Sequence, residues 1–117
     1  MNIGKDLVAA SATPLVLSIL SEGESYGYAI LKRVNELSKG ELQWTDGMLY
    51  PLLHRLERNG FVEAAWGRSE TGRRRKYYRL TDRGLEELAT HQRQWQLVDS
   101  TLRGIWCAAL DVACLGV

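Results

Sequence analysis

The sequence predicts a mainly α-helical fold with one small β-hairpin. Three helical patterns of apolar residues occupy the first 60 residues, two short runs typical of strands follow, and a last helical pattern extends to about residue 112. Of the 117 residues, 45% are hydrophobic and 25% are charged, which indicates one folded globular domain. No apolar run reaches the roughly 18 to 20 residues that a membrane helix requires, so we expect a cytoplasmic protein without a membrane span.

The first two helical patterns are separated by a glycine. The first ends near Gly23, and we expect Pro14 to bend its middle. The second begins at Ser25, which suits a helix N-cap, and residues 38–40 break it. Its apolar positions follow at three- and four-residue steps and are Tyr26, Ile30, Leu31, Val34 and Leu37. These patterns predict two successive helices.

The third helical pattern follows residues 45–47 and closes at Asn59-Gly60. Pro51 has no amide hydrogen and is costly outside the first turn, so we expect this helix to begin later than Asp46. One face carries the apolar residues Leu49, Leu52, Leu53 and Leu56. The opposite face carries Met48, Pro51, His54, Arg55 and Arg58.

Two aromatic and β-branched runs, 61–66 and 76–80, predict strands joined by a basic loop over 67–75. This loop contains glycine and is too polar to pack inside, so we expect an exposed hairpin tip. Residues 55–79 hold eight basic and three acidic residues, a charge of +5, whereas the rest of the chain carries −4. The asymmetry indicates either a binding surface for a polyanion or a solvated charged surface.

The last helical pattern, from residue 82 to about 112, predicts a helix about 45 Å long. An apolar seam repeats along it every seven residues and contains Leu88, Trp95 and Leu102. A core this small cannot bury the far half of such a helix, so we expect a homodimer whose interface contains the seam and Trp106. The alternative is a break at Arg103-Gly104 that folds the helix back on its own domain.

This order of elements is the plan of a winged helix-turn-helix DNA-binding domain over residues 1–80, followed by a C-terminal dimerisation helix over 81–113. In that geometry the third helix enters the major groove of DNA, and the tip of the hairpin, or wing, reaches flanking phosphates or the minor groove. Arginine suits a wing because a guanidinium can fork onto phosphate. Winged helices also serve as protein-interaction modules that bind no nucleic acid, which is the competing interpretation.

Three stretches carry a resemblance to a known family. They are 47–62, with Leu49-Tyr50-Pro51 and Arg55-Leu56-Glu57, then 72–84, with Lys76-Tyr77-Tyr78-Arg79-Leu80-Thr81, and the earlier 25–30. Over residues 7 to about 106 the chain resembles the PadR family of bacterial transcriptional regulators. The resemblance implies a homodimeric repressor that binds an inverted repeat in double-stranded DNA and releases it when a small molecule binds.

The expected DNA-binding residues lie on the third helix and the wing. They are Met48, Tyr50, Pro51, His54, Arg55, Arg58, Arg73, Arg74, Arg75 and Lys76. Packing in the core is the alternative for Tyr50. Successive side chains alternate faces on a strand, so one ring of the Tyr77-Tyr78 pair must be core and the other near the wing or the DNA, and we expect both rings to be partly core. We expect Trp44 and Trp66 to be packing residues.

Trp95 followed by Asp99 is similar to the multidrug-responsive members of the family, in which paired tryptophans sandwich flat aromatic ligands across the dimer axis. The expected ligand site contains Trp95, Asp99, Leu88 and Leu7. Plain packing in the dimer core is the alternative for Trp95. The chain has none of the common enzyme motifs, and Cys107 and Cys114 lack the spacing of a zinc site. We therefore expect no catalytic residues, metal or cofactor.

Overall fold

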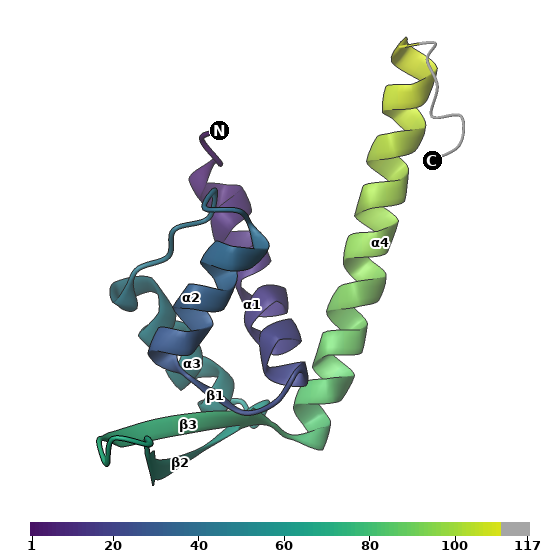
Figure 1. The fold of residues 1–117 in the computed structure, drawn as a ribbon. Coiled ribbons are helices and arrows are strands. Elements are labelled where there is room, and N and C mark those ends of the chain that lie inside the picture. Colours follow the sequence, from purple (N-terminus) through teal and green to yellow (C-terminus); the bar gives the residue numbers. More distant parts are fainter. Residues whose placement is uncertain (111–117) are drawn as a thin grey trace.

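The computed structural model describes residues 1–110, which form helices α1 to α4 and a three-stranded sheet (Figure 1). Helices α1 (Lys5–Ser21), α2 (Gly27–Leu37) and α3 (Asp46–Arg58) pack around one core. The apolar face predicted for the third helix is confirmed, because its four leucines are all buried. The other buried residues of this core are Ala12, Val16, Leu17, Ile19, Leu20, Ile30, Val34, Trp44, Val62, Tyr78 and Leu88. The predicted mainly α fold with a β-hairpin is therefore confirmed.

The N-cap predicted at Ser25 is wrong. Ser25 and Tyr26 form a two-residue strand, β1 (Ser25–Tyr26), and α2 begins after it at Gly27. Tyr26 pairs with Tyr77 of the hairpin, and their rings meet edge to face with centroids 5.6 Å apart. This pairing with a strand some 50 residues later holds Tyr26 extended, whereas its apolar character alone suits the helical pattern.

The late start predicted for the third helix is also wrong, because α3 begins at Asp46 and Pro51 lies in its interior. The hydrogen bond that Pro51 lacks would end on the carbonyl of Gly47, four residues earlier. Gly47 is exposed in the first turn, where water can satisfy that carbonyl. The proline is therefore tolerated at this position.

The hairpin consists of β2 (Val62–Arg68) and β3 (Arg74–Leu80), which are antiparallel with a register from Val62–Leu80 to Arg68–Arg74. Strand β3 is central, between β1 and β2. The turn is shorter than predicted and spans 69–73: the amide of Ser69 donates to the carbonyl of Arg73 at 2.8 Å. Arg74 and Arg75 are therefore strand residues, with fixed faces, and not loop residues. We call the hairpin the wing.

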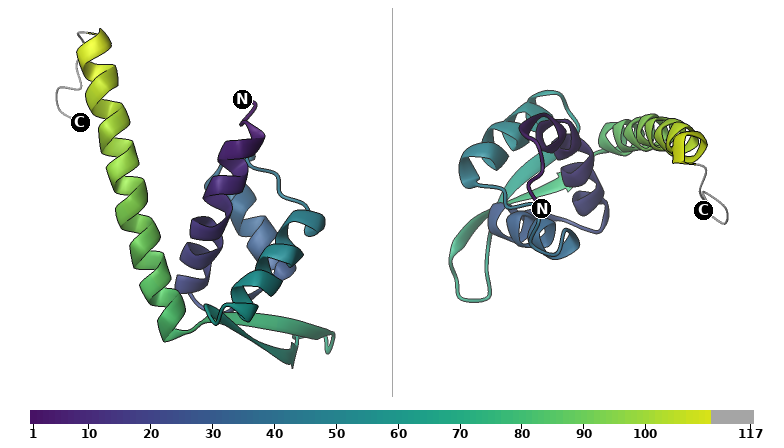
Figure 2. Two further views of the ribbon diagram at one scale, coloured as in Figure 1. Left: turned by 180° about the vertical axis from the view of Figure 1, so that it is seen from behind. Right: turned by 90° about the horizontal axis from the view of Figure 1, so that it is seen from above.

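Helix α4 (Asp82–Leu110) is continuous past Arg103 and Gly104. Its start packs closely against the segment between α3 and β2, because a Cβ at Gly84 would overlap the carbonyl of Phe61. The first turns of α4 pack on α1, where Leu88 is buried. Beyond this contact α4 diverges from the other helices and extends away from the core (Figure 2). No helix within residues 1–110 is long and apolar enough to cross a membrane.

Candidate nucleic-acid interface

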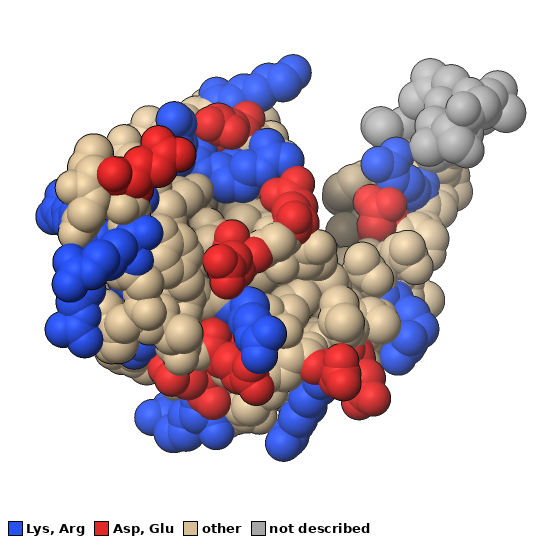
Figure 3. Space-filling model, turned by 60° about the horizontal axis from the view of Figure 1, so that its bottom comes forward, with Lys and Arg blue, Asp and Glu red and all other residues tan. Residues whose placement is uncertain are grey.

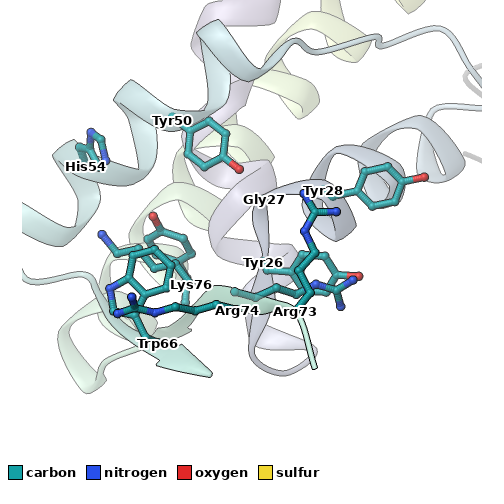
Figure 4. Close-up of a pocket in the computed structure, with 11 residues that line it drawn as sticks. Tyr26, Gly27, Tyr28, Tyr50, His54, Trp66, Arg73, Arg74 and Lys76 are labelled. Carbon is teal, nitrogen blue, oxygen red and sulfur yellow. The ribbon is translucent and has the colours of Figure 1, made fainter. Parts of the chain in front are cut away.

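A groove of about 740 Å³ separates α3 from the wing, and the first turn of α2 closes one end of it (Figure 4). We call it the wing groove. The residues that line it are Tyr26, Gly27, Tyr28, Tyr50, His54, Trp66, Arg73, Arg74, Arg75, Lys76 and Tyr78. Four of these side chains are Lys or Arg, and none is Asp or Glu. The groove therefore has the charge that an anionic ligand requires.

The predicted face of α3 divides into two parts. Tyr50 and His54 line the groove, whereas the Arg55 guanidinium points to α1, where it lies 3.5 Å from the Thr13 hydroxyl. Met48 is half-buried and packs against the core. Pro51 and Arg58 are exposed on α3 but do not line the groove. The structure thus brings only part of the predicted set together.

Tyr50 connects the third helix to the start of the second. Its side chain is 39% exposed, so it is not a core residue. A Cβ on Gly27 would overlap the Tyr50 hydroxyl, so glycine at the start of α2 leaves room for the Tyr50 ring in this position. The ring therefore lies across the groove with its polar end at the α2 N-terminus, where backbone amides without helical partners favour an anion.

The basic residues of β3 differ in what holds them. The Arg74 guanidinium lies over the Trp66 ring at 4.3 Å, and the Arg75 guanidinium lies over the Tyr26 ring at 4.1 Å. The ammonium of Lys76 is 3.7 Å from the Glu57 carboxylate of α3, so part of its charge is already neutralised. The side chain of Arg73, at the turn, makes no hydrogen bond or ion pair to another residue in 1–110.

Tyr78 forms the floor of the groove. It is 1% exposed, and burial raises the pKa of its hydroxyl, with the Glu57 carboxylate as a further cause. Tyr78 therefore remains neutral at ordinary pH and acts as a core residue. This confirms the expectation that one ring of the Tyr77-Tyr78 pair is core.

Five groove residues are absent from the predicted set: Tyr26, Gly27, Tyr28, Trp66 and Tyr78. Trp66 was expected to pack, but it is 59% exposed and carries Arg74 on its ring. The strand period does indicate its direction, because residues 62, 64 and 66 share one face. The groove residues at the start of α2 are missing from the prediction because it places the helix N-cap at Ser25, whereas α2 begins at Gly27.

Charge is unevenly distributed over the molecule. Lys and Arg side chains gather at the left of Figure 3, where the wing tip lies, whereas Asp and Glu side chains are interspersed with Lys and Arg over the middle of this face. The charge asymmetry of the sequence thus corresponds to a basic end of the molecule.

The residues predicted for a ligand site and a dimer interface lie on or near α4. Leu88 and Trp95 line an apolar hollow of about 260 Å³ between α1 and α4. Leu7 and Asp99 do not line it, and the Asp99 carboxylate pairs with Arg103 at 3.0 Å. The seam continues through Leu102 and Trp106, which are exposed. Among the described residues, no group of three or more His, Cys, Asp or Glu could hold a metal ion.

Comparison with known proteins supports a regulator of transcription. Residues 16–90 match the model of the transcriptional regulator PadR-like family. A transcriptional regulator from Clostridium thermocellum is 32% identical to this chain, with a TM-score of 0.78. The match covers 86% of this chain and 94% of that regulator. A PadR-like transcriptional regulator from Bacillus cereus is 29% identical to this chain, with a TM-score of 0.77. This match covers 87% of this chain and 97% of the Bacillus protein. The transcriptional regulator YqjI of Escherichia coli is 27% identical over 76% of this chain, which spans only 41% of YqjI.

Proposed function

Because the chain belongs to the PadR-like family of transcriptional regulators, it is a DNA-binding regulator, and we propose that it acts as a homodimeric repressor released by a flat aromatic ligand. The members of this family are DNA-binding proteins and not enzymes. The observation that carries the proposal is the wing groove, in which an exposed helix face and four cationic side chains surround one open space.

In this proposal α3 enters the major groove of DNA, where base edges are distinguishable. Of the predicted residues, His54 and Arg58 combine exposure with groups that can hydrogen-bond to bases. Tyr50 and Pro51 lie beside them on the exposed face. Met48 and Arg55 are directed elsewhere, and we infer that they support the position of α3.

The wing supplies the phosphate contacts of the proposal. Arg73, Arg74 and Arg75 have no carboxylate partner within residues 1–110, so their charge is available to the DNA backbone. Lys76 is expected to contribute less, because Glu57 lies beside it.

The dimer of the proposal forms through α4. Its C-terminal half extends away from the core and carries exposed apolar side chains on or beside the seam, which a second copy would bury: Val98, Leu102, Ile105 and Trp106. A two-fold dimer presents its two recognition helices to successive major grooves. The operator would then be an inverted repeat.

We expect duplexes selected from a random pool to contain two half-sites about one helical turn apart, because the dimer axis relates the two copies of α3. Selection followed by footprinting of the bound duplex measures this spacing. Binding to single, isolated half-sites would contradict the dimeric operator. If no duplex were bound at any salt concentration, the chain would instead fit an interaction module without nucleic acid.

The ligand of the proposal lies between Trp95 and its symmetry mate, beside the hollow that Trp95 lines with α1. Indole rings stack on flat aromatic compounds, and Asp99 could balance a cationic one, although its carboxylate also pairs with Arg103. Leu88, which lines this hollow from α4, and Leu7, which is exposed near the start of α1, would supply apolar walls. A ligand there would change the separation of the two copies of α3 and so lower DNA affinity.

We expect Trp95→Ala to weaken binding of a flat cationic dye by about threefold to thirtyfold, because it removes the stacking surface and its cation–π attraction. Fluorescence of the dye reports binding in the native and variant proteins. Trp44→Phe is the control, because Trp44 is buried in the core away from this hollow. Equal affinity of the native and Trp95→Ala proteins would mean that Trp95 does not bind the ligand and only packs in the dimer core.

A further inference from the structure

A second hollow lies on the wing, next to the groove. It has a volume of about 460 Å³ and is lined by Tyr26, Arg68, Ser69, Glu70, Thr71, Arg75 and Tyr77. We call it the outer hollow. Tyr26 and Arg75 line both spaces, so they form the border between them. Trp66 and Arg74 line the wing groove alone.

Arg74 and Arg75, which each stack on an aromatic ring, extend toward opposite edges of the sheet. Strand β3 is central, Arg74 lies over Trp66 of β2, and Arg75 lies over Tyr26 of β1. Because they are neighbours on a strand, their side chains also leave opposite faces. The wing thus carries one ordered guanidinium toward α3 and one on the side of the outer hollow.

The platform below Arg75 is itself held in place. The Tyr26 ring meets the Tyr77 ring edge to face at 5.6 Å. Tyr77 in turn covers Gly67, where an added Cβ would lie 3.0 Å from the Tyr77 ring. A guanidinium stacked on such a ring keeps its N–H edges free and loses little further freedom when it binds phosphate.

We propose that the outer hollow is a second phosphate-binding surface, in which Arg75, ordered by Tyr26, contacts the DNA strand opposite to the one contacted by Arg74. This inference rests on the proposed function. A ribbon that enters a groove of duplex DNA has one strand's backbone on each side, so cations on both of its sides reach both strands. Glu70 is the one acid that lines the hollow, and it opposes a phosphate there.

The first test is the salt dependence of binding to a fluorescent mixed-sequence 30-base-pair duplex. Arg75→Ala is expected to lower the slope of log affinity against log salt by about 0.9, the value of one phosphate contact. Arg79→Ala is the matched control, because it removes the same charge from the same strand, where Arg79 is paired with Glu63 at 2.6 Å. It should leave the slope unchanged.

The role of the Tyr26 ring, on which Arg75 stacks, is tested separately from the charge of Arg75. Arg75→Lys and Tyr26→Leu should each weaken binding by about two- to fivefold with the slope unchanged, and the double variant should be no weaker than either. Tyr26→Phe keeps the ring and should bind like the native protein. An effect of Tyr26→Phe as large as that of Tyr26→Leu would overturn the platform role.

The strand assignment is tested by phosphate ethylation interference on a selected duplex. Arg74→Ala and Arg75→Ala should remove interference at phosphates on opposite strands. Loss on the same strand, or an unchanged slope in Arg75→Ala, overturns the inference while DNA binding by the native protein stands. If the native protein bound no duplex, that result would instead contradict the proposed function.

Discussion

Replacing Leu102 with glutamate is expected to convert the protein from a dimer to a monomer at micromolar concentration. Leu102 lies on the same face of α4 as Leu88 and Trp95, which precede it by fourteen and seven residues. It is 39% exposed in the single chain, and it lies in the part of α4 that extends away from the core. A carboxylate buried there without a partner would weaken association by about 3–5 kcal/mol.

Sedimentation measures the outcome, since the native dimer should have about twice the 13.2 kDa mass of the chain. Leu97→Glu is the matched control: Leu97 is also an exposed leucine of α4, at 68%, but it lies on a different face from the seam. A dimeric Leu102→Glu protein, or a monomeric native protein, would contradict an interface built on the seam. Circular dichroism of the variant distinguishes dissociation from unfolding.

Dimer loss has a consequence for DNA binding. A monomer would carry one copy of α3 and one wing, so it would engage a single half-site. Affinity for an inverted repeat should then fall toward that for an isolated half-site, because the second contact is no longer intramolecular.

The helices and their buried faces could be predicted because apolar spacing reports which side of a helix is covered. Leu49 and Leu53 illustrate this, since both are completely buried. The same spacing does not report what the opposite face meets. Arg55 and His54 are adjacent in the sequence, yet Arg55 reaches Thr13 of α1 while His54 lines the groove. That difference depends on how α1 and α3 pack.

The wing shows the same division between local and distant information. Its two strands follow from local residue preferences, and the basic residues could be assigned to it. The partners of those residues come from far along the chain: Lys76 meets Glu57 of α3, and Arg75 meets Tyr26, which precedes it by 49 residues. A two-residue strand such as β1 has almost no pattern of its own, because the pairing with β3 is what extends it.

The largest expected effect on DNA binding comes from replacing Arg73, Arg74 and Arg75 together with alanine. Each is expected to neutralise one phosphate, so the slope of log affinity against log salt should fall by up to about 2.7. Affinity at low salt should fall on the order of 100-fold, and all sequences should be weakened alike because phosphates carry no base identity. Fluorescence anisotropy over a salt series, with several duplexes, measures both quantities.

Two controls separate charge from fold and from base reading. The triple lysine variant keeps three positive charges on the wing, so its slope should stay near that of the native protein even where affinity is reduced by loss of stacking. His54→Ala should instead change sequence preference and leave the slope nearly unaltered, because His54 faces the groove from α3 and is expected to contact base edges and not phosphates. A triple alanine variant with native affinity and slope would show that the backbone contacts lie elsewhere, and the wing would then serve only to brace α3.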